Sequence, residues 1–140
     1  MTTKDPQKTW NEYYEKKKRQ RMEEATKLWE QMSNSGVTAE TVLAIDFLHF
    51  GTNKENVNDL EKQLSENYEV EVVPGEEEGY CYIKGTTRPY GINLSKEQHA
   101  GWVEFMSDMA QSYACVFSTW SIEAPSLGVS FDSESIESAS

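Results

Sequence analysis

The fold of this chain is decided by residues 41–125, which read TVLAIDFLHFGTNKENVNDLEKQLSENYEVEVVPGEEEGYCYIKGTTRPYGINLSKEQHAGWVEFMSDMAQSYACVFSTWSIEAP. Short apolar or alternating runs, which are typical of strands, are interspersed with amphipathic runs, which are typical of helices. Their order is strand, helix, strand, strand, helix, strand. This order predicts a compact α+β sandwich.

The first half of the stretch predicts two strands around one helix. The first strand is the apolar run Val42–Phe50, and Glu69–Val73 alternates with period two as a half-exposed strand does. Between them, Thr52–Glu55 has the spacing of a helix capping box. The apolar residues that follow have helical spacing and are Val57, Leu60, Leu64 and Tyr68.

The second half repeats the pattern. Tyr80–Gly85 alternates as a strand, Ser95–Gln98 has capping-box spacing, and Ala114–Ile122 is the last predicted strand. The predicted buried stripe of the intervening helix is Trp102, Met106, Met109 and Tyr113.

Two strand-helix-strand halves of similar length predict the ferredoxin-like βαββαβ sandwich, with both helices on one face of an antiparallel sheet. The competing interpretation is a three-stranded sheet with a swapped or peripheral last strand. Residues 1–36 add a long N-terminal amphipathic helix over Pro6–Met32, and the Ser-rich, acidic residues 126–140 predict a flexible tail. The ferredoxin-like domain itself is assigned to residues 37–125.

The charge of the chain is unevenly distributed. The formal net charge of the 140 residues is -11; residues 1–33 hold eight basic and six acidic side chains, and the rest hold five basic and eighteen acidic ones. An acidic body repels phosphate backbones and attracts basic proteins, so we expect a basic protein partner and no direct binding of nucleic acid. No apolar run approaches the roughly 18 residues that span a bilayer, and the N-terminal sequence lacks a secretory apolar core, so we expect no membrane association and a cytoplasmic location.

The run Lys16–Arg21 (KKKRQR) in the leading helix has two interpretations. It resembles a basic patch for nucleic acid or a membrane. Because glutamates flank it on both sides, we favour a solvated helix face that pairs with the acidic body.

The sequence offers few residues for catalysis or for binding a metal or cofactor, and we predict none of these functions. Asp46 and His49 are three apart in a strand and point to opposite faces, and His99, in the first turn of a helix, is expected at the surface or in a cap. Cys81 and Cys115 fall in strands that the first strand separates, so both are expected to be free thiols that act as small apolar residues of the core or of a sheet face.

Two segments are candidate binding sites. The acidic run Glu76, Glu77 and Glu78 lies in a predicted turn and is a candidate docking patch for Arg-rich protein segments. The loop Gly85–Gly91, with Lys84 and Arg88, resembles a phosphate-cradling loop in composition but lacks the spacings of a P-loop or a dinucleotide site.

Alternation also predicts an outer sheet face that mixes aromatic and charged side chains. Its members are Glu69, Glu71, Tyr80, Tyr82 and Lys84. Such a face can stack RNA bases, although the two glutamates would oppose phosphates. We favour the alternative that the leading helix covers this face, through Trp10, Tyr13, Leu28 and Trp29.

Three segments carry a resemblance to a known family. Ile45–Asp46 in the first strand, Tyr68–Val70 after the first sandwich helix, and Trp120–Pro125 in the last strand resemble the regulator of ribonuclease E activity B (RraB) family, over about residues 37–125. The resemblance implies a ferredoxin-like sandwich without catalysis that binds and inhibits an RNA-degrading endonuclease. The Ser-rich tail and the basic run depart from the family, whose tail is strongly acidic.

We therefore weigh three hypotheses. The first is a protein-binding regulator of a ribonuclease E-like endonuclease or another basic protein, which contacts its partner through Glu76–Glu78, Tyr80, Tyr82, Lys84 and Arg88. The second is an RNA-binding module that uses the sheet face and the basic helix, and the third is a small enzyme.

Overall fold

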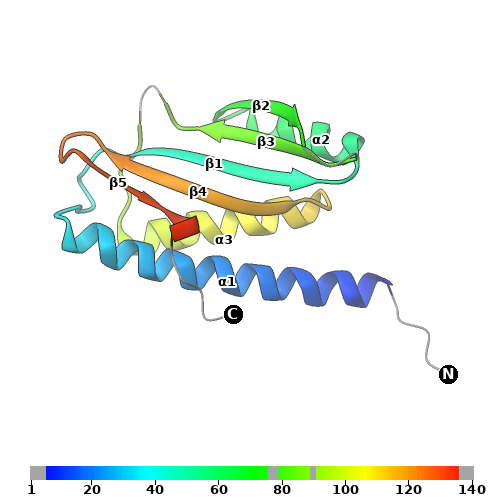
Figure 1. Cartoon of the computed structure of the whole chain (residues 1–140), viewed down its shortest axis with the longest axis horizontal. Helices are drawn as coiled ribbons and strands as arrows, with labels where there is room; N and C mark the ends of the chain where they lie inside the picture. The colour runs from blue at the N-terminus through cyan, green and yellow to red at the C-terminus, as the bar shows by residue number, and fades with distance from the viewer. Residues whose placement is uncertain (1–5, 76–78, 89–90, 136–140) are drawn as a thin grey trace.

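The computed structural model describes residues 6–75, 79–88 and 91–135, and Figure 1 shows their arrangement. The helices are α1 (Pro6–Asn34), α2 (Lys54–Leu64) and α3 (Lys96–Ser112). The strands are β1 (Ala44–Gly51), β2 (Glu69–Pro74), β3 (Cys81–Thr86), β4 (Val116–Ala124) and β5 (Val129–Asp132), and a short 3-10 turn, η1 (Ser133–Ser135), follows. The α+β class and the long N-terminal helix are confirmed.

The five strands form one sheet in the order β2-β3-β1-β4-β5, and every neighbouring pair is antiparallel. Helix α2 packs against β2 and β3, and α3 packs against β4. Helix α1 runs beside α3 and reaches β5 and η1 (Figure 1). The described helices therefore lie as one layer on one face of the sheet.

The central strand β1 shows how alternation separates the two faces of the sheet. Ile45, Phe47 and His49 are buried under the helices, whereas Asp46 and Leu48 between them are only partly buried on the other face. The core continues into α1 through Leu28 and Met32, which have no exposed surface. Burial of this apolar area is the main force that holds the layers together.

The helix caps follow the local sequence closely. The predicted capping box of α3 is confirmed, because the Ser95 side chain accepts from the backbone N–H of Gln98 and the Gln98 side chain accepts from the backbone N–H of Ser95. The predicted cap of α2 at Thr52 is wrong by one residue: Asn53 caps the helix and accepts from Asn56 N at 3.0 Å. Asparagine is the stronger N-cap residue of the two.

The predicted apolar stripes are largely buried. Val57, Leu60 and Leu64 are buried in α2, and Trp102 and Met106 are buried in α3. Met109 and Tyr113 are half-buried. Tyr68 lies beyond the end of α2, where its hydroxyl accepts from Trp102 Nε1 at 3.0 Å.

The predicted flexible tail is wrong for residues 129–135. Val129–Asp132 form the edge strand β5, which pairs with Ser121–Ala124 of β4, and Ser133 Oγ accepts from the backbone N–H of Trp120 at 3.0 Å. Val129 and Phe131 pack against the core, but a four-residue alternation is too short to stand out in a Ser-rich sequence. Residues 136–140 lie outside the described part of the chain.

Both cysteines are free, as predicted. Cys81 pairs across the ladder with Gly51, and the Cys115 thiol lies on the other side of that glycine. Burial raises the pKa of the Cys115 thiol to about 11, so this residue behaves as a small apolar side chain at neutral pH.

A second glycine makes room for an aromatic ring in the core. Gly85 in β3 is the register partner of Phe47 in β1, and a Cβ atom at Gly85 would overlap the Phe47 ring. The ring itself contacts the rings of Tyr68 and Trp102, so it has little freedom to move away. This packing makes position 85 intolerant of a side chain.

We expect Gly85→Ala to destabilise the protein by about 1–3 kcal/mol, because overpacking forces side chains and backbone to shift. The free energy of unfolding, measured by urea denaturation, tests this. The control is the same substitution in a Phe47→Leu variant, whose smaller side chain leaves more room. There Gly85→Ala should lower the free energy of unfolding by at least about 0.5 kcal/mol less than in the original protein. Strictly additive losses in the double variant would show that the two positions do not compete for space.

Candidate functional site on the outer face of the sheet

The sheet face opposite the helices is the candidate site, and α1 does not cover it as a layer. Leu28 is fully buried on the helical side, and the Trp29 ring lies 6.0 Å from the His99 ring of α3. The prediction that Leu28 and Trp29 cover the outer face is therefore wrong. Apolar burial of Leu28 and Met32 fixes this position of α1, and an ion pair accompanies it, since Lys18 Nζ lies 2.9 Å from Asp108 Oδ1 of α3.

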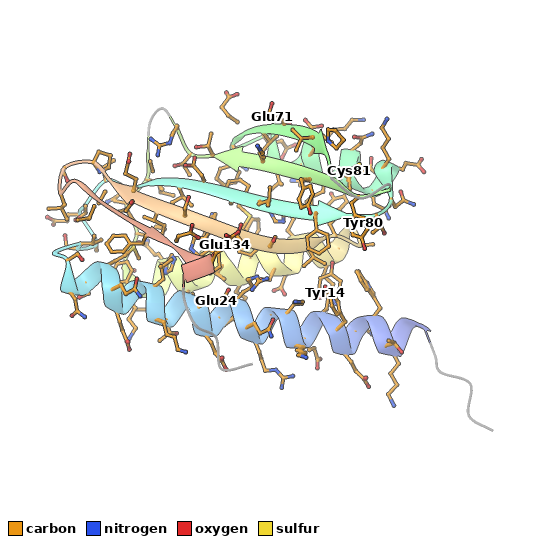
Figure 2. All side chains as sticks on the ribbon, viewed as in Figure 1. Tyr14, Glu24, Glu71, Tyr80, Cys81 and Glu134 are labelled. Carbon is orange, nitrogen blue, oxygen red and sulfur yellow. The ribbon has the colours of Figure 1, made fainter. Side chains whose placement is uncertain are left out.

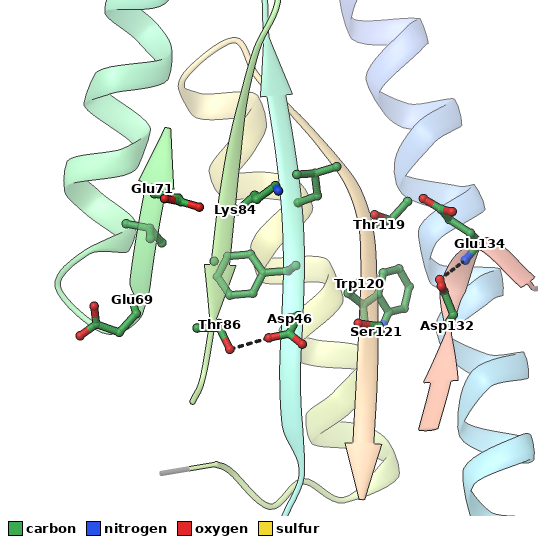
Figure 3. Close-up of a pocket in the computed structure, with 14 residues that line it drawn as sticks. Asp46, Glu69, Glu71, Lys84, Thr86, Thr119, Trp120, Ser121, Asp132 and Glu134 are labelled. Atoms are coloured by element: carbon green, nitrogen blue, oxygen red, sulfur yellow. Dashed lines mark hydrogen bonds between the residues drawn. The ribbon is translucent and has the colours of Figure 1, made fainter. Parts of the chain in front are cut away.

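A pocket of about 540 Å³ lies on this face, and Figure 3 shows the residues that line it. It is lined by residues of all five strands and by Glu134 of η1. Its charged residues are Asp46, Glu69, Glu71, Asp132, Glu134 and Lys84, and its polar neighbours include Thr86, Thr119 and Ser121. The pocket thus places five carboxyl groups around one lysine, and we call it the acidic pocket.

The ladder register aligns the lining residues of the acidic pocket in two rows across the strands. Glu69, Thr86, Asp46, Ser121 and Asp132 are successive register partners in one row. Glu71, Lys84, Leu48 and Thr119 form the next row. The predicted outward placement of Glu69, Glu71, Tyr82 and Lys84 agrees with this register.

Asp46 is already engaged within the protein. Thr86 Oγ1 donates to Asp46 Oδ1 at 2.6 Å, and Arg88 Nε lies 3.4 Å from the same oxygen. Arg88 Nη2 also lies 3.4 Å from Glu123 Oε1, and the hydrogen bond to Asp46 is the main cause of a raised pKa of Arg88. Glu69 and Glu71, on the edge strand β2, are exposed at the other side of the acidic pocket.

The candidate phosphate loop also uses its polar groups internally. Thr87 Oγ1 accepts from the backbone N–H of Ile45 at 2.9 Å, and the Thr87 N–H donates to the Ile45 carbonyl at 2.9 Å. Together with the two ion pairs of Arg88, these contacts anchor the loop to β1 and β4. Pro89 and Tyr90 of this loop lie outside the described residues.

A second pocket of about 570 Å³ lies at the other end of β1. Its aromatic residues are Trp10, Tyr13, Phe50 and Tyr80, and Thr9, Gly51, Thr52, Ala114 and Val116 complete it. The Phe50 ring lies 6.4 Å from the Tyr80 ring and 6.2 Å from the Tyr82 ring. We call this second pocket the aromatic pocket; Thr9, Trp10 and Tyr13 of α1 line it together with Phe50 of β1.

The structure brings together some of the predicted site residues and leaves others apart. Tyr80 and Tyr82 lie near Phe50 at the aromatic end, Lys84 lines the acidic pocket, and Arg88 lies beside it in its ion pairs. Glu76, Glu77 and Glu78 lie outside the described residues. Sequence reasoning missed Asp46 and Phe50 as members of one face, although their even spacing in a predicted strand carries that signal.

Both histidines lie on the helical side of the sheet. His49 is fully buried, neither of its ring nitrogens is hydrogen-bonded to any residue that the structure describes, and burial lowers its pKa to about 3. The surface position expected for His99 is wrong: it is 1% exposed, Trp120 Nε1 donates to its Nε2 at 3.2 Å, and burial lowers its pKa to about 4. Neither histidine lines the acidic or the aromatic pocket.

The basic run of α1 pairs with the body of the protein, which agrees with the interpretation we favoured. Besides its contact with Asp108, Lys18 lies 3.9 Å from Glu104. Arg21 Nε donates to the Phe117 carbonyl at 3.0 Å, and Arg21 Nη1 donates to Glu24 at 2.8 Å. These two cations of the run therefore connect α1 to α3 and to β4. Figure 2 shows α1 with its side chains beside α3.

Within residues 6–75, 79–88 and 91–135, no helix combines the length and the apolar character needed to cross a membrane, and no three His, Cys, Asp or Glu side chains gather as metal ligands would. No protein-family model matches the sequence. The comparison with curated proteins also finds no match.

Proposed function

We propose that this protein is a non-catalytic regulator that binds a basic protein through the outer face of its sheet. The observation that carries the proposal is this face, which none of the described helices covers as a layer and on which five carboxyl groups and one lysine line a single pocket. The whole chain adds a formal net charge of -11, which would attract a cationic partner from a distance and raise its association rate.

We further propose that the partner is an RNA-degrading endonuclease of the ribonuclease E type, and that binding lowers its activity in the cytoplasm. The support is the resemblance of residues 37–125 to the RraB family. The strand order β2-β3-β1-β4 with α2 and α3 on one face is compatible with the ferredoxin-like arrangement which that resemblance implies. Strand β5 and helix α1 are then additions to it.

A second candidate function is RNA binding, which one observation favours. Phe50, Tyr80 and Tyr82 gather on the sheet face, and bases can stack on such rings. The neighbouring Glu69 and Glu71 would repel phosphates, and for this reason we rank RNA binding second.

The test is to measure how the purified protein affects cleavage of a fluorogenic RNA by a ribonuclease E-type endonuclease. We expect inhibition that persists when the RNA concentration is raised far above that of the protein, together with direct binding to the endonuclease. Tight binding to RNA oligomers, with inhibition only through sequestration of the RNA, would contradict the proposal and favour the second candidate.

The acidic run Glu76–Glu78 gives this test a specific variant. Replacing all three glutamates with glutamine should slow association with the endonuclease and flatten its dependence on salt, because long-range attraction sets the encounter rate. Glu12, Glu23 and Glu30, which are exposed on α1, are the matched control for the same change in net charge. An equal loss of association rate in both triple variants would show that only net charge matters.

A further inference from the structure

We infer that the outer face recognises an extended cationic segment that inserts one bulky apolar side chain into the aromatic pocket and places arginines over the acidic pocket. This inference rests on the proposed function and specifies the chemistry of its partner. It is carried by the position of the two pockets on one sheet face, by the run of β1 that connects them, and by the acidic lining of one pocket beside the aromatic lining of the other.

The two pockets are connected along the strands by a known register. Asp46 pairs with Thr86 at the acidic pocket, Leu48 pairs with Lys84 in the middle, and Phe50 pairs with Tyr82 at the aromatic end, whereas the register with β4 shifts between Leu48 and His49. These residues alternate along β1, so all of them face the same side. At about 3.3 Å per residue, the four residues from Asp46 to Phe50 span about 13 Å.

The aromatic pocket suits an inserted apolar side chain. The Trp10 and Tyr13 rings are stacked with centroids 5.8 Å apart, and Tyr13 is 36% exposed. Phe50 of β1 and Tyr80, just before β3, line the pocket from the sheet side, so rings from α1 and from two other segments of the chain line one space. Rigid aromatic walls around an apolar pocket are typical of an anchor site in a protein interface.

The acidic pocket supplies the charge complementarity. Asp46 is held by Thr86 and Arg88, whereas Glu69 and Glu71 are exposed. A guanidinium group forms strong charge-assisted hydrogen bonds with carboxylates, which makes arginine the expected side chain here. An anionic membrane surface or a nucleic acid would be repelled by the same carboxylates.

The spacing of the pockets sets the sequence pattern of the partner. In an extended chain, residues two apart face the same side, so an arginine four residues from the apolar anchor reaches about 13 Å along the sheet. A residue between them lies over Leu48. In the partner segment, the arginine and the apolar anchor must therefore be an even number of residues apart, so that both side chains face the sheet.

The experiment measures binding of fluorescein-labelled peptides to the full chain by fluorescence polarisation. The matched peptides are RSRSLSF and its reversed form FSLSRSR, because the segment can run in either direction. Their shifted counterparts, SRSRLSF and FSLRSRS, have the same composition but place the arginines out of alternation with the phenylalanine. We expect one matched peptide to bind at least about tenfold tighter than its shifted counterpart.

Protein variants then locate the two contacts. Trp10→Ala and Tyr80→Ala should each weaken binding of the matched peptide about fivefold, and so should Glu69→Gln combined with Glu71→Gln. The matched controls, Phe105→Ala on the exposed side of α3 and Glu23→Gln combined with Glu30→Gln on α1, should leave binding unchanged. Circular dichroism spectra confirm that each variant is folded.

Equal affinity for matched and shifted peptides in both directions would overturn the inference, and so would self-association of the protein that hides this face. The peptide pairs need no protein variant, so an unfolded variant does not remove the test. Register-selective peptide binding without endonuclease inhibition would reject the proposed function alone. Inhibition that persists in the Trp10, Tyr80, Glu69 and Glu71 variants would reject the inference alone.

Discussion

Met106→Asp is expected to abolish the cooperative unfolding transition of the protein. Met106 is a fully buried residue of α3 in the main core cluster. An unpaired carboxylate at this position would lose several kcal/mol of solvation, which is comparable to a typical total stability of roughly 5–15 kcal/mol. Thermal denaturation followed by far-ultraviolet circular dichroism measures the effect.

The neighbouring residue supplies the control for this prediction. Phe105 is 51% exposed on the same helix, so Phe105→Asp introduces the same charge at the surface and should change the free energy of unfolding by no more than about 1 kcal/mol. Similar stabilities of the two variants would show that the Met106 side of α3 does not face the core.

The second large effect is an expected loss of stability as the pH falls from 7 to 5. Burial lowers the pKa of His49 to about 3 and that of His99 to about 4, whereas an unfolded histidine titrates near 6.5. Below pH 6.5 the unfolded chain therefore binds protons that the folded protein does not bind. The full contribution is present above pH 6.5, and each histidine loses roughly 2 kcal/mol by pH 5.

Urea denaturation at several pH values between 5 and 8 tests this dependence. His49→Leu is the informative variant, because neither ring nitrogen of His49 has a hydrogen-bond partner that the substitution would leave unpaired. We expect the loss between pH 7 and 5 to fall by about half in this variant. An unchanged slope would show that His49 can be protonated in the folded protein.

The elements that could be predicted from the sequence are those whose signals are local. Each of these signals involves only a few neighbouring residues. The structure contains the capping box at Ser95–Gln98, the buried stripe from Val57 to Leu64 and the strand that the alternation of Glu69–Val73 predicts. The position of α1 depended on contacts distant in sequence. Its apolar residues fit either face of the sheet, and pairing of Lys18 with Asp108 accompanies its placement on the helical side.

The candidate site was predictable only in part for the same reason. Alternation placed Tyr82 and Lys84 on the outer face, but only the strand order aligns them with Phe50 and Leu48 of β1. Trp10 also lines the aromatic pocket, although it lies forty residues before Phe50 in the sequence. The prediction of a surface position for His99 failed because the residue packs against a distant part of the sequence. Trp120 of β4 donates a hydrogen bond from its indole to His99.

The contact between Gly85 and Phe47 also has a consequence for how this sequence can diverge over time. Because the Phe47 ring occupies the space that a side chain at position 85 would need, position 85 can gain a side chain only if position 47 holds a smaller residue. A descendant that gains a methyl group at 85 would need a smaller residue at 47, acquired first or in the same step. Covariation of these two positions, small against large, is therefore the evolutionary trace that this packing should leave.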